Sequence, residues 1–291
     1  MPTDNAPTST IRMLVPFGSG ELGGSQIMTL RLLEALDRRR FDPEVWLFRD
    51  GPFRERLERA RIPVTVLSPW WLRLPWRLKR LQHKIAAGGY DLVYLHASRL
   101  IAQLALTLEI PCVEMINMPR DPEAGGWCQF PGIDRLATRW NTAVVTPSQF
   151  IENQLVERGV PADDIHVIHS WVDAERFYRP ERREAVRAER LIDNHTPLIL
   201  NVGRLSPEKA HDDLLLVAAR VAAEHPKALF VIVGRGPMED EIRRRIRRMN
   251  LKDNVRLLGF VEDMPDLYAA ADLMLHTARR EAFATVILQR M

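Results

Sequence analysis

The sequence predicts an α/β protein of two domains, each a parallel β-sheet covered by helices. The chain has 291 residues, which suggests two domains at roughly 100–200 residues each. Hydrophobic residues make up 46% and charged residues 27%, as is usual for a globular protein with a sizeable core. Short apolar runs alternate with longer helical patterns along the whole chain, which is typical of parallel strands joined by helices.

The first domain is expected to span residues 1–172. Helical patterns lie at Ser25–Arg40, Trp76–Ala87 and Ser148–Arg158, and the serines that open two of them, Ser25 and Ser148, are expected N-caps. Seven apolar runs are interpreted as strands: Ile11–Val15, Glu44–Phe48, Val64–Leu67, Leu92–Leu95, Cys112–Ile116, Ala143–Thr146 and Ile165–Ile168.

Residues 173–196 interrupt this alternation. They are dense in Arg and Glu and are interpreted as a charged linker, with a solvated helix as the alternative. A second domain over 197–291 then shows four strand patterns, at Leu198–Val202, Leu229–Val233, Val255–Leu258 and Leu273–His276. Its helical patterns are Glu208–Glu224, Met238–Arg248, Met264–Ala270 and Thr285–Met291. Four strands are fewer than the ~5–6 of a typical sheet, so we expect a truncated second domain; a compact small domain is the alternative.

Composition excludes several classes of protein. The net charge is only +3, and no basic stripe alternates with base-stacking aromatics, so nucleic-acid binding is not expected. Cys112 and Cys128 have neither a zinc spacing nor a disulfide pattern, which favours reduced thiols. The polar N-terminal residues lack the apolar core of a signal peptide, and no run reaches the ~20 apolar residues of a membrane span. A cytoplasmic protein, at most peripheral at the inner face of a membrane, is expected.

Three segments carry residues suited to binding a ligand, the first two an anionic one. The Gly-rich turn Phe17–Ser25 lies between the first strand and the first helix, where close backbone approach and the helix N-terminus favour negative charge; an ordinary turn explains it equally well. Asn201–Lys209 starts at the end of the first strand of the second domain and enters a helix. Its Arg204 and Lys209 flank a helix entrance opened by Ser206 and Pro207.

Two cations at a helix entrance form a natural diphosphate clamp, and they can stabilise a phosphate leaving group without a metal ion. Solvated surface cations are the alternative interpretation of Arg204 and Lys209. The third segment is Glu281–Thr285, ahead of the last helical pattern. A carboxylate at this position can accept hydrogen bonds from sugar hydroxyls, although an acid at a helix N-terminus is also simply favoured by the helix dipole.

Together these segments resemble the family-4 retaining glycosyltransferases of the GT-B fold, in which two Rossmann-like domains face each other across a cleft. The resemblance covers residues 12–291 and is most specific in the second half. There "VGRLSPEKAHDDLLLVA", "VIVGRGPMEDEI", "VRLLGFVEDMPDLYAAADLML" and "REAFATVILQRM" follow one another in the order and at the spacing of the family. "IHVIHSWVDAERF" resembles the segment that joins the two domains.

The resemblance implies a role for each matching position. Arg204, Lys209 and Glu281 would be the catalytic residues, with the two cations on the diphosphate of a nucleotide-sugar donor and Glu281 on its sugar. Further donor contacts would come from Gly23, Gly24, Asn117, Gly203, Gly259, Phe260, Val261, Ala282, Phe283, Ala284, Thr285 and Gln289. The family needs no cofactor and no metal, so none is expected. The second domain would bind the nucleotide sugar and the first would lie on the acceptor side. The acceptor would be a sugar, a lipid-linked molecule or a precursor of cell-envelope polysaccharide.

The sequence departs from the family pattern at several positions. Gln289 stands where a second glutamate usually holds the ribose, and it can bond a hydroxyl only without charge. Asn117 stands where a histidine is often found near the reacting sugar. Ala210 replaces a usual glycine, and family members continue past Met291. A non-catalytic nucleotide-sugar-binding remnant is therefore the main alternative to a transferase; an epimerase or a phosphorylase would need acid–base pairs or a cofactor lysine that we do not identify.

Two further features have alternative interpretations. His96 follows the fourth strand at the carboxyl edge of the sheet, where ligands gather, but a structural histidine is favoured. The segment Trp70–Lys84 combines an apolar helical stripe with the basic residues Arg73, Arg77, Arg80 and Lys84. Tryptophan and arginine together suit the surface of an anionic bilayer, whereas a helix packed on the first sheet with a solvated basic face is the favoured alternative.

Overall fold

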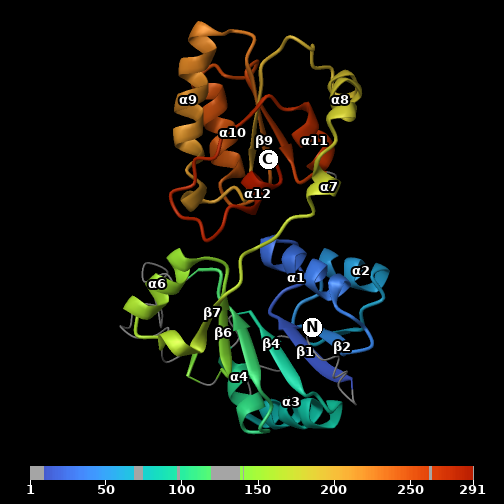
Figure 1. Cartoon of the computed structure of the whole chain (residues 1–291). Coiled ribbons are helices and arrows are strands. Elements are labelled where there is room, and N and C mark those ends of the chain that lie inside the picture. Colours follow the sequence, from blue (N-terminus) through green and yellow to red (C-terminus); the bar gives the residue numbers. More distant parts are fainter. Residues whose placement is uncertain are drawn as a thin grey trace, which may run out of the picture. The chain divides into compact units, whose positions relative to one another are not determined.

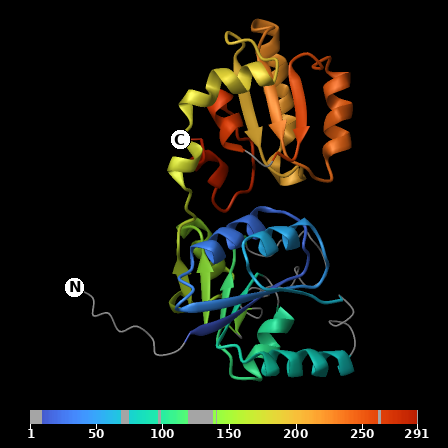
Figure 2. The ribbon, with the colours of Figure 1, turned by 90° about the vertical axis from the view of Figure 1, so that its right-hand side faces the viewer.

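The computed structural model divides into two compact units, Met1–His169 and Ser170–Met291, which are described separately (Figure 1, Figure 2). It describes residues 10–68, 75–96, 99–118, 138–139, 141–261 and 264–290. The second unit thus begins before the segment 173–196 rather than after it. Both units are parallel sheets covered by helices, so the predicted pair of Rossmann-like domains is confirmed.

The first unit is a seven-stranded parallel sheet in the order β3-β2-β1-β4-β5-β6-β7. All seven predicted strands are present, with small shifts at their ends. Their bounds are β1 Ile11–Phe17, β2 Phe41–Leu47, β3 Val64–Val66, β4 Leu92–Leu95, β5 Cys112–Met115, β6 Ala143–Thr146 and β7 Ile165–Val167. The chain adds β2 and β3 on one side of β1 and then crosses to β4 on the other side.

Helices cover both faces of this sheet (Figure 1). Alternate residues of β1 point to opposite faces, as the two-residue repeat of a strand requires. Met13, Val15 and Phe17 pack with α1 (Gly24–Ala35) and α2 (Pro52–Arg59). Leu14 packs instead with α3 (Pro75–Gly88) and α4 (Arg99–Leu106). The α6 helix (Gln149–Glu157), followed by the short 3₁₀ helix η4 (Ala162–Asp164), packs beside β6 and β7.

The helix starts agree in part with the predicted caps. Ser148 is the N-cap of α6, and its hydroxyl accepts a bond from the Ile151 amide at 3.4 Å. Ser25 is not a cap, because α1 begins one residue earlier with Gly23 in the N-cap position. Within the described residues no helix combines the length and hydrophobicity that crossing a bilayer requires.

The second unit contains a four-stranded parallel sheet in the order β10-β9-β8-β11. The bounds of its strands are β8 Leu198–Val202, β9 Leu229–Val233, β10 Val255–Gly259 and β11 Leu273–Met274. Its helices are η6 (Pro207–Lys209), α9 (His211–Glu224), α10 (Glu239–Arg248), α11 (Met264–Ala270) and α12 (Thr285–Leu288). Helices α9 and α10 pack on one face of this sheet through Leu214, Ile242 and their neighbours, and α11 packs on the other.

The charged segment 173–196 is part of this second unit. It forms α7 (Ala174–Phe177), η5 (Pro180–Arg182) and α8 (Arg183–Glu189), and it buries Phe177, Val186 and Ile192 in the core beneath β8 and β9. Arg187 is completely buried and donates to the carbonyls of Ala270, Asp193 and Thr196. Two arginines of the segment predicted as a linker, Arg183 and Arg187, therefore donate to the carbonyls at the end of α11.

Candidate active site

The topology of the second sheet selects one place for a ligand. Strands β9 and β10 lie on one side of β8, and β11 lies on the other. The loops after β8 and β11 therefore diverge at the carboxyl edge, which is where open α/β sheets bind their ligands. Arg204 and Lys209 belong to the loop after β8, and Glu281 belongs to the loop after β11. The fold thus brings together residues that are more than 70 positions apart in the sequence.

The three predicted catalytic residues differ in their contacts. The Lys209 ammonium forms an ion pair with the Glu281 carboxylate, and the two side chains are 19% and 29% exposed. The stem of Lys209 lies over Gly203, with its Cδ 3.8 Å from the place of a Cβ at that residue. Arg204 is exposed, and its guanidinium has no hydrogen-bond or ion-pair partner within the described part of the chain. One clamp cation is therefore fixed and the other remains open to a ligand.

A third residue, His276, contacts this pair. Its Nε2 lies 3.2 Å from the same Glu281 oxygen, Oε2, that Lys209 reaches. Burial of Glu281 would raise its pKa, but hydrogen bonds from His276 and Lys209 outweigh burial and hold that pKa below its ordinary range. Glu281 is thus a carboxylate at neutral pH. The sequence did not single out His276, since it falls at the end of an apolar run that reads as strand.

The loop before Glu281 is tied to the clamp by its backbone. The Thr277 hydroxyl donates to the Lys209 carbonyl at 3.0 Å, and the Arg279 amide donates to the Glu208 carbonyl at 2.9 Å. The Arg279 guanidinium adds three contacts to Asp213, the shortest at 2.9 Å. These bonds fix the distance between the cationic and the acidic half of the site.

The clamp loop begins differently from the sequence prediction. Pro207–Lys209 is a short 3₁₀ turn, and α9 starts only at His211, because Ala210 adopts a left-handed conformation with φ 50° and ψ 47°. The Ser206 hydroxyl donates to the Glu208 side chain and does not cap the helix. Ala210 thus occupies a conformation that glycine adopts at no steric cost.

Two glycines that the sequence did not assign to the site support the clamp loop from beneath. Gly234 has φ +145°, and a Cβ there would lie 1.8 Å from the Gly203 carbonyl oxygen. At Gly236 the same atom would lie 2.2 Å from the Leu205 carbonyl oxygen. The loop after β9 packs so closely under residues 203–205 that no side chain fits between them. In the sequence, the "VGRGP" pattern is the signal that could have assigned Gly234 and Gly236 to the site.

Gly259, Phe260 and Val261, which were expected to contact the donor, lie at and just after the end of β10, at the same edge of the sheet. Gly259 ends β10 with φ +72°, and its carbonyl accepts a bond from the Gly234 amide at 2.8 Å. The Phe260 ring is 45% exposed, whereas Val261 packs partly into the core. The exposed Arg235 lies beside this loop, with its Nε 3.8 Å from the place of a Cβ at Gly259.

Residues 282–289 are placed less simply. Ala282, Phe283 and Ala284 are half-buried ahead of α12. The Thr285 amide donates to the Phe283 carbonyl at 2.8 Å, so this amide already has a hydrogen-bond partner. Gln289 is also occupied in part, since its Oε1 accepts a bond from the Tyr268 hydroxyl at 3.0 Å. Its amide nitrogen remains the group that could reach a ribose.

In the first unit the Gly-rich turn divides into two parts. Gly20 packs against the loop after β2, where a Cβ would lie 2.7 Å from the Gly51 nitrogen. A Cβ at Gly24 would meet nothing within 4 Å, and one at Gly23 would meet only the flexible Gln26 side chain. The backbone at Gly23 and Gly24 is thus open to a ligand, while Gly20 serves packing.

Asn117 and His96 lie at the carboxyl edge of the first sheet. The Asn117 side chain donates to the Ser25 hydroxyl at 3.5 Å. His96 shares a 2.7 Å hydrogen bond with Thr29 and stacks on Phe17, and burial lowers the pKa of His96 to about 4. These contacts fit the structural role that the sequence favoured for His96. They keep its ring neutral at physiological pH.

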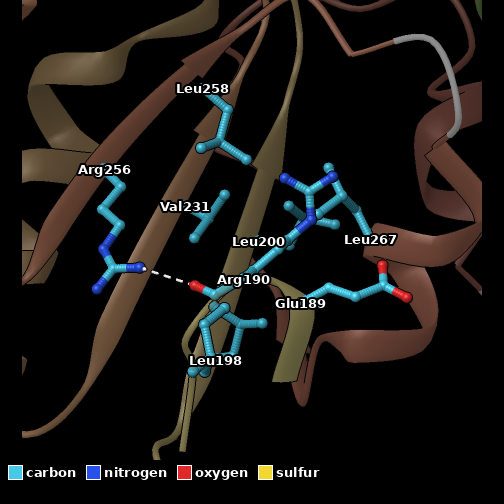
Figure 3. A pocket seen from close by; sticks show the side chains of 9 residues that line it. Glu189, Arg190, Leu198, Leu200, Val231, Arg256, Leu258 and Leu267 are labelled. Atoms are coloured by element: carbon cyan, nitrogen blue, oxygen red, sulfur yellow. Dashed lines mark hydrogen bonds between the residues drawn. The ribbon is translucent and has the colours of Figure 1, made fainter. Parts of the chain in front are cut away.

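A hollow of about 250 Å³ lies elsewhere in the second unit (Figure 3). Its walls are mainly aliphatic side chains of β8, β9, β10 and α11, with Arg256 donating to the Arg190 carbonyl at 3.5 Å on its rim. None of the clamp residues lines it. The hollow lies on a face of the sheet rather than at its carboxyl edge, so we do not assign it to the donor.

Comparisons with known proteins agree with this arrangement. The family model described as Glycosyltransferase Family 4 matches residues 22–176, and the one described as Glycosyl transferases group 1 matches residues 182–291. The chain belongs to glycosyltransferase family 4. The two matches fall on the two structural units and meet in the charged segment that precedes β8.

Individual relatives are more distant. The GPI3 subunit of phosphatidylinositol N-acetylglucosaminyltransferase from Saccharomyces cerevisiae is 29% identical over 140 residues, which are 47% of this chain and 30% of that protein. A GDP-mannose-dependent phosphatidylinositol monomannoside mannosyltransferase from Corynebacterium glutamicum is 30% identical over 76% of this chain and 58% of its own length. The chain therefore spans only 30% to 58% of the length of these relatives.

The similarity to solved structures covers nearly the whole chain. Anabaena HepE, solved in complex with UDP and glucose, matches 96% of this chain and 78% of its own, with a TM-score of 0.82 and 25% sequence identity. The lipopolysaccharide glycosyltransferase WaaG matches with a TM-score of 0.71 at 16% identity, which supports the fold alone. Both sheets of this chain thus have counterparts in known glycosyltransferases.

Proposed function

We propose that this protein binds a nucleoside diphosphate sugar at the carboxyl edge of its second sheet and transfers the sugar to an acceptor with retention at the anomeric carbon. The observation that carries the proposal is the joining of Lys209 and Glu281 at the switch point between β8 and β11. A cation for phosphate and a carboxylate for hydroxyls stand side by side there. A nucleotide sugar carries the matching groups, a diphosphate and the hydroxyls of the sugar attached to it.

Arg204 and Lys209 stabilise the charge that develops on the diphosphate as it leaves. Lysine has three N–H donors, so Lys209 can hold Glu281 with one and the phosphate oxygens with the others. Glu281 accepts hydrogen bonds from the hydroxyls of the transferred sugar. Because electrostatic contacts aimed at developing charge are the main source of such catalysis, the clamp contributes to the transition state more than to the ground state.

Retention follows from front-face substitution, which the family resemblance suggests. The bond from the anomeric carbon to the diphosphate oxygen breaks as a bond to the acceptor oxygen forms on the same face. The proton of the acceptor hydroxyl passes to the departing diphosphate. This route needs no protein nucleophile and no metal ion, and it is compatible with Asn117, which cannot act as an acid or base.

The acceptor that we favour is lipid-linked or a precursor of envelope polysaccharide. The Saccharomyces and Corynebacterium relatives are both named for phosphatidylinositol-based acceptors. Helix α3 adds a physical argument: Leu81 and Ile85 are buried in the core of the first unit, while Lys79, Arg80 and Lys84 remain exposed. An exposed basic face of this kind attracts anionic lipid. The tryptophans Trp70 and Trp71, and Arg73, lie outside the described residues.

The clamp can be tested by nucleotide binding. We expect calorimetry to show that Arg204→Ala combined with Lys209→Ala weakens UDP or GDP binding roughly 100-fold, since two charge-assisted contacts are lost. The matched control replaces Arg220 and Lys227, an exposed arginine and lysine of the same unit. Equal affinity of the clamp variant and wild type would overturn the assignment.

A non-catalytic nucleotide-sugar-binding protein is the second candidate. It is favoured by Gln289, whose carbonyl oxygen is occupied by Tyr268, and by Asn117. Both functions require the same clamp, so binding alone does not separate them. Release of UDP or GDP from a nucleotide sugar in the presence of a phosphatidylinositol-based acceptor would support the transferase; tight binding with no release across several donors and acceptors would support the second candidate.

A further inference from the structure

The two oxygens of the Glu281 carboxylate are not equivalent. The Lys209 ammonium and the His276 imidazole both bond to Oε2, the latter at 3.2 Å. Within the described part of the chain no hydrogen bond reaches Oε1. Two donors that converge on one oxygen from different elements fix the rotation of a carboxylate, which a single donor cannot do. The second oxygen is then held in one direction.

His276 is well placed to provide this restraint. Its side chain is 15% exposed. The residue before it is bonded to β8 twice, through the Leu275 amide to the Leu200 carbonyl at 2.9 Å and through Asn201 Nδ2 to the Leu275 carbonyl at 2.8 Å. The residue after it, Thr277, donates to the Lys209 carbonyl at 3.0 Å. The imidazole therefore stands on backbone that is anchored to the clamp on both sides.

Lys209 alone would restrain Glu281 poorly. A lysine ammonium is a point charge on a flexible stem with four rotatable bonds, and here it must also serve the diphosphate. An imidazole is rigid and is attached through two torsions only. When phosphate oxygens draw Lys209 toward the ligand, His276 is the donor that keeps Glu281 in place.

We propose that His276 is a positioning residue for donor recognition: it fixes the Glu281 carboxylate so that Oε1 faces the transferred sugar, and it thereby gives the site its affinity for the sugar beyond the diphosphate. This inference rests on the proposed function, because it requires that the second unit bind a nucleotide sugar.

The measurable quantity is the dissociation constant of a nucleoside diphosphate divided by that of the corresponding nucleoside diphosphate sugar. We would measure it by calorimetry with UDP and UDP-glucose, and with GDP and GDP-mannose. We expect His276→Ala to lower this ratio about tenfold while the affinity for the nucleoside diphosphate changes less than twofold, as for loss of one charge-assisted contact. His276→Gln, which keeps a side-chain N–H donor, should restore most of the ratio. His225→Ala, at an exposed histidine after α9, is the matched control.

A double-mutant cycle tests whether His276 acts through Glu281. In a Glu281→Gln background, His276→Ala should lower the ratio by less than twofold, because residues that act as one unit are not additive. Additive losses would overturn the proposal. So would equal weakening of the diphosphate and the nucleotide sugar, which is the signature of a merely structural histidine. If wild type binds none of the four probes, the proposed function itself fails; if it binds them and His276→Ala leaves the ratio unchanged, only this inference fails.

Discussion

Replacing Gly234 by alanine should damage the donor site from beneath without changing any residue that contacts a ligand. Gly234 has φ +145°, a conformation that residues with a side chain rarely adopt, and its Cβ would lie 1.8 Å from the Gly203 carbonyl oxygen. Since real Cβ atoms essentially never approach another atom within 3.0 Å, that carbonyl must retreat by at least 1.2 Å. The peptide that moves is the one that precedes Arg204.

The size of the effect follows from what this movement disturbs. The Gly203 amide bonds to the Val233 carbonyl at 3.0 Å, and the Gly234 amide bonds to the Gly259 carbonyl at 2.8 Å. Backbone strain of this kind costs about 1–3 kcal/mol, and each lost bond about 1 kcal/mol. We therefore expect Gly234→Ala to destabilise the second unit by about 3–5 kcal/mol. A displacement near 1 Å at the clamp should also weaken nucleotide binding about tenfold, as for loss of one charge-assisted contact.

The assay must separate the two units. Six of the seven tryptophans precede residue 170, so tryptophan fluorescence during urea unfolding mainly reports the first unit, whereas hydrogen exchange of residues 198–261 reports the second. Gly234→Ala should lose protection in that range and leave the fluorescence midpoint unchanged. Gly18→Ala, where a Cβ meets nothing within 4 Å, should change stability by less than about 0.5 kcal/mol. A Gly234→Ala protein with wild-type protection and wild-type affinity would refute the reasoning.

Three further predictions follow from named contacts. Arg187→Met should destabilise the second unit by about 3–5 kcal/mol in urea unfolding followed by circular dichroism, because it leaves three carbonyls without their donor. Arg190→Met is the control, and equal stabilities of the two variants would contradict the capping role of Arg187. Glu281 has a lowered pKa in the folded state, so its contribution to stability is present above about pH 4.5 and is lost as pH falls further. Glu281→Gln should therefore flatten the acid side of a plot of unfolding free energy against pH. An unchanged plot would count against the pairing of Glu281 with Lys209 and His276. Neutralising Arg77, Arg80 and Lys84 to Gln should abolish co-sedimentation with anionic vesicles at low salt, whereas neutralising Arg220, Lys227 and Lys252 should not; absence of binding by wild type would favour a soluble acceptor.

The strands were predictable because buried parallel strands are continuous apolar runs. The exception is the start of β2, which extends back to Phe41 through Pro43. Proline cannot donate to a strand on its N–H side, but β3 pairs only with Val45–Leu47, so Pro43 faces no partner there. Helix α2 was missed because it buries only Phe53 and Leu57, and two apolar positions do not establish a helical period.

The charged segment 173–196 was misjudged for a different reason. Charge density predicts solvation, yet Arg187 is completely buried, because its guanidinium donates to the Ala270 carbonyl at the end of α11 and pairs with Asp272, more than 80 residues away. No local pattern reports such a partner. The contact of Lys209 with Glu281 is of the same kind: each residue was predicted from its own motif, but their ion pair depends on β8 and β11 being neighbours. His276 and Gly234 were missed because their roles exist only in that pairing and in the packing of adjacent loops.

In both sheets the order in which strands are added reverses after the third strand. The reversal lies between β1 and β4 in the first unit and between β8 and β11 in the second. The Gly23–Gly24 turn and the Arg204–Lys209 loop thus follow equivalent strands, and topology alone directs both toward a ligand. In each unit two side chains bond to each other across this point of reversal, and the two pairs differ in charge. In the second unit they are a lysine and a glutamate; in the first they are Thr29 and His96, a histidine kept neutral by burial. A charged edge suits a diphosphate and sugar, whereas a neutral edge suits an acceptor that presents a hydroxyl. We therefore propose that the second unit binds the donor and that the first unit lies on the acceptor side.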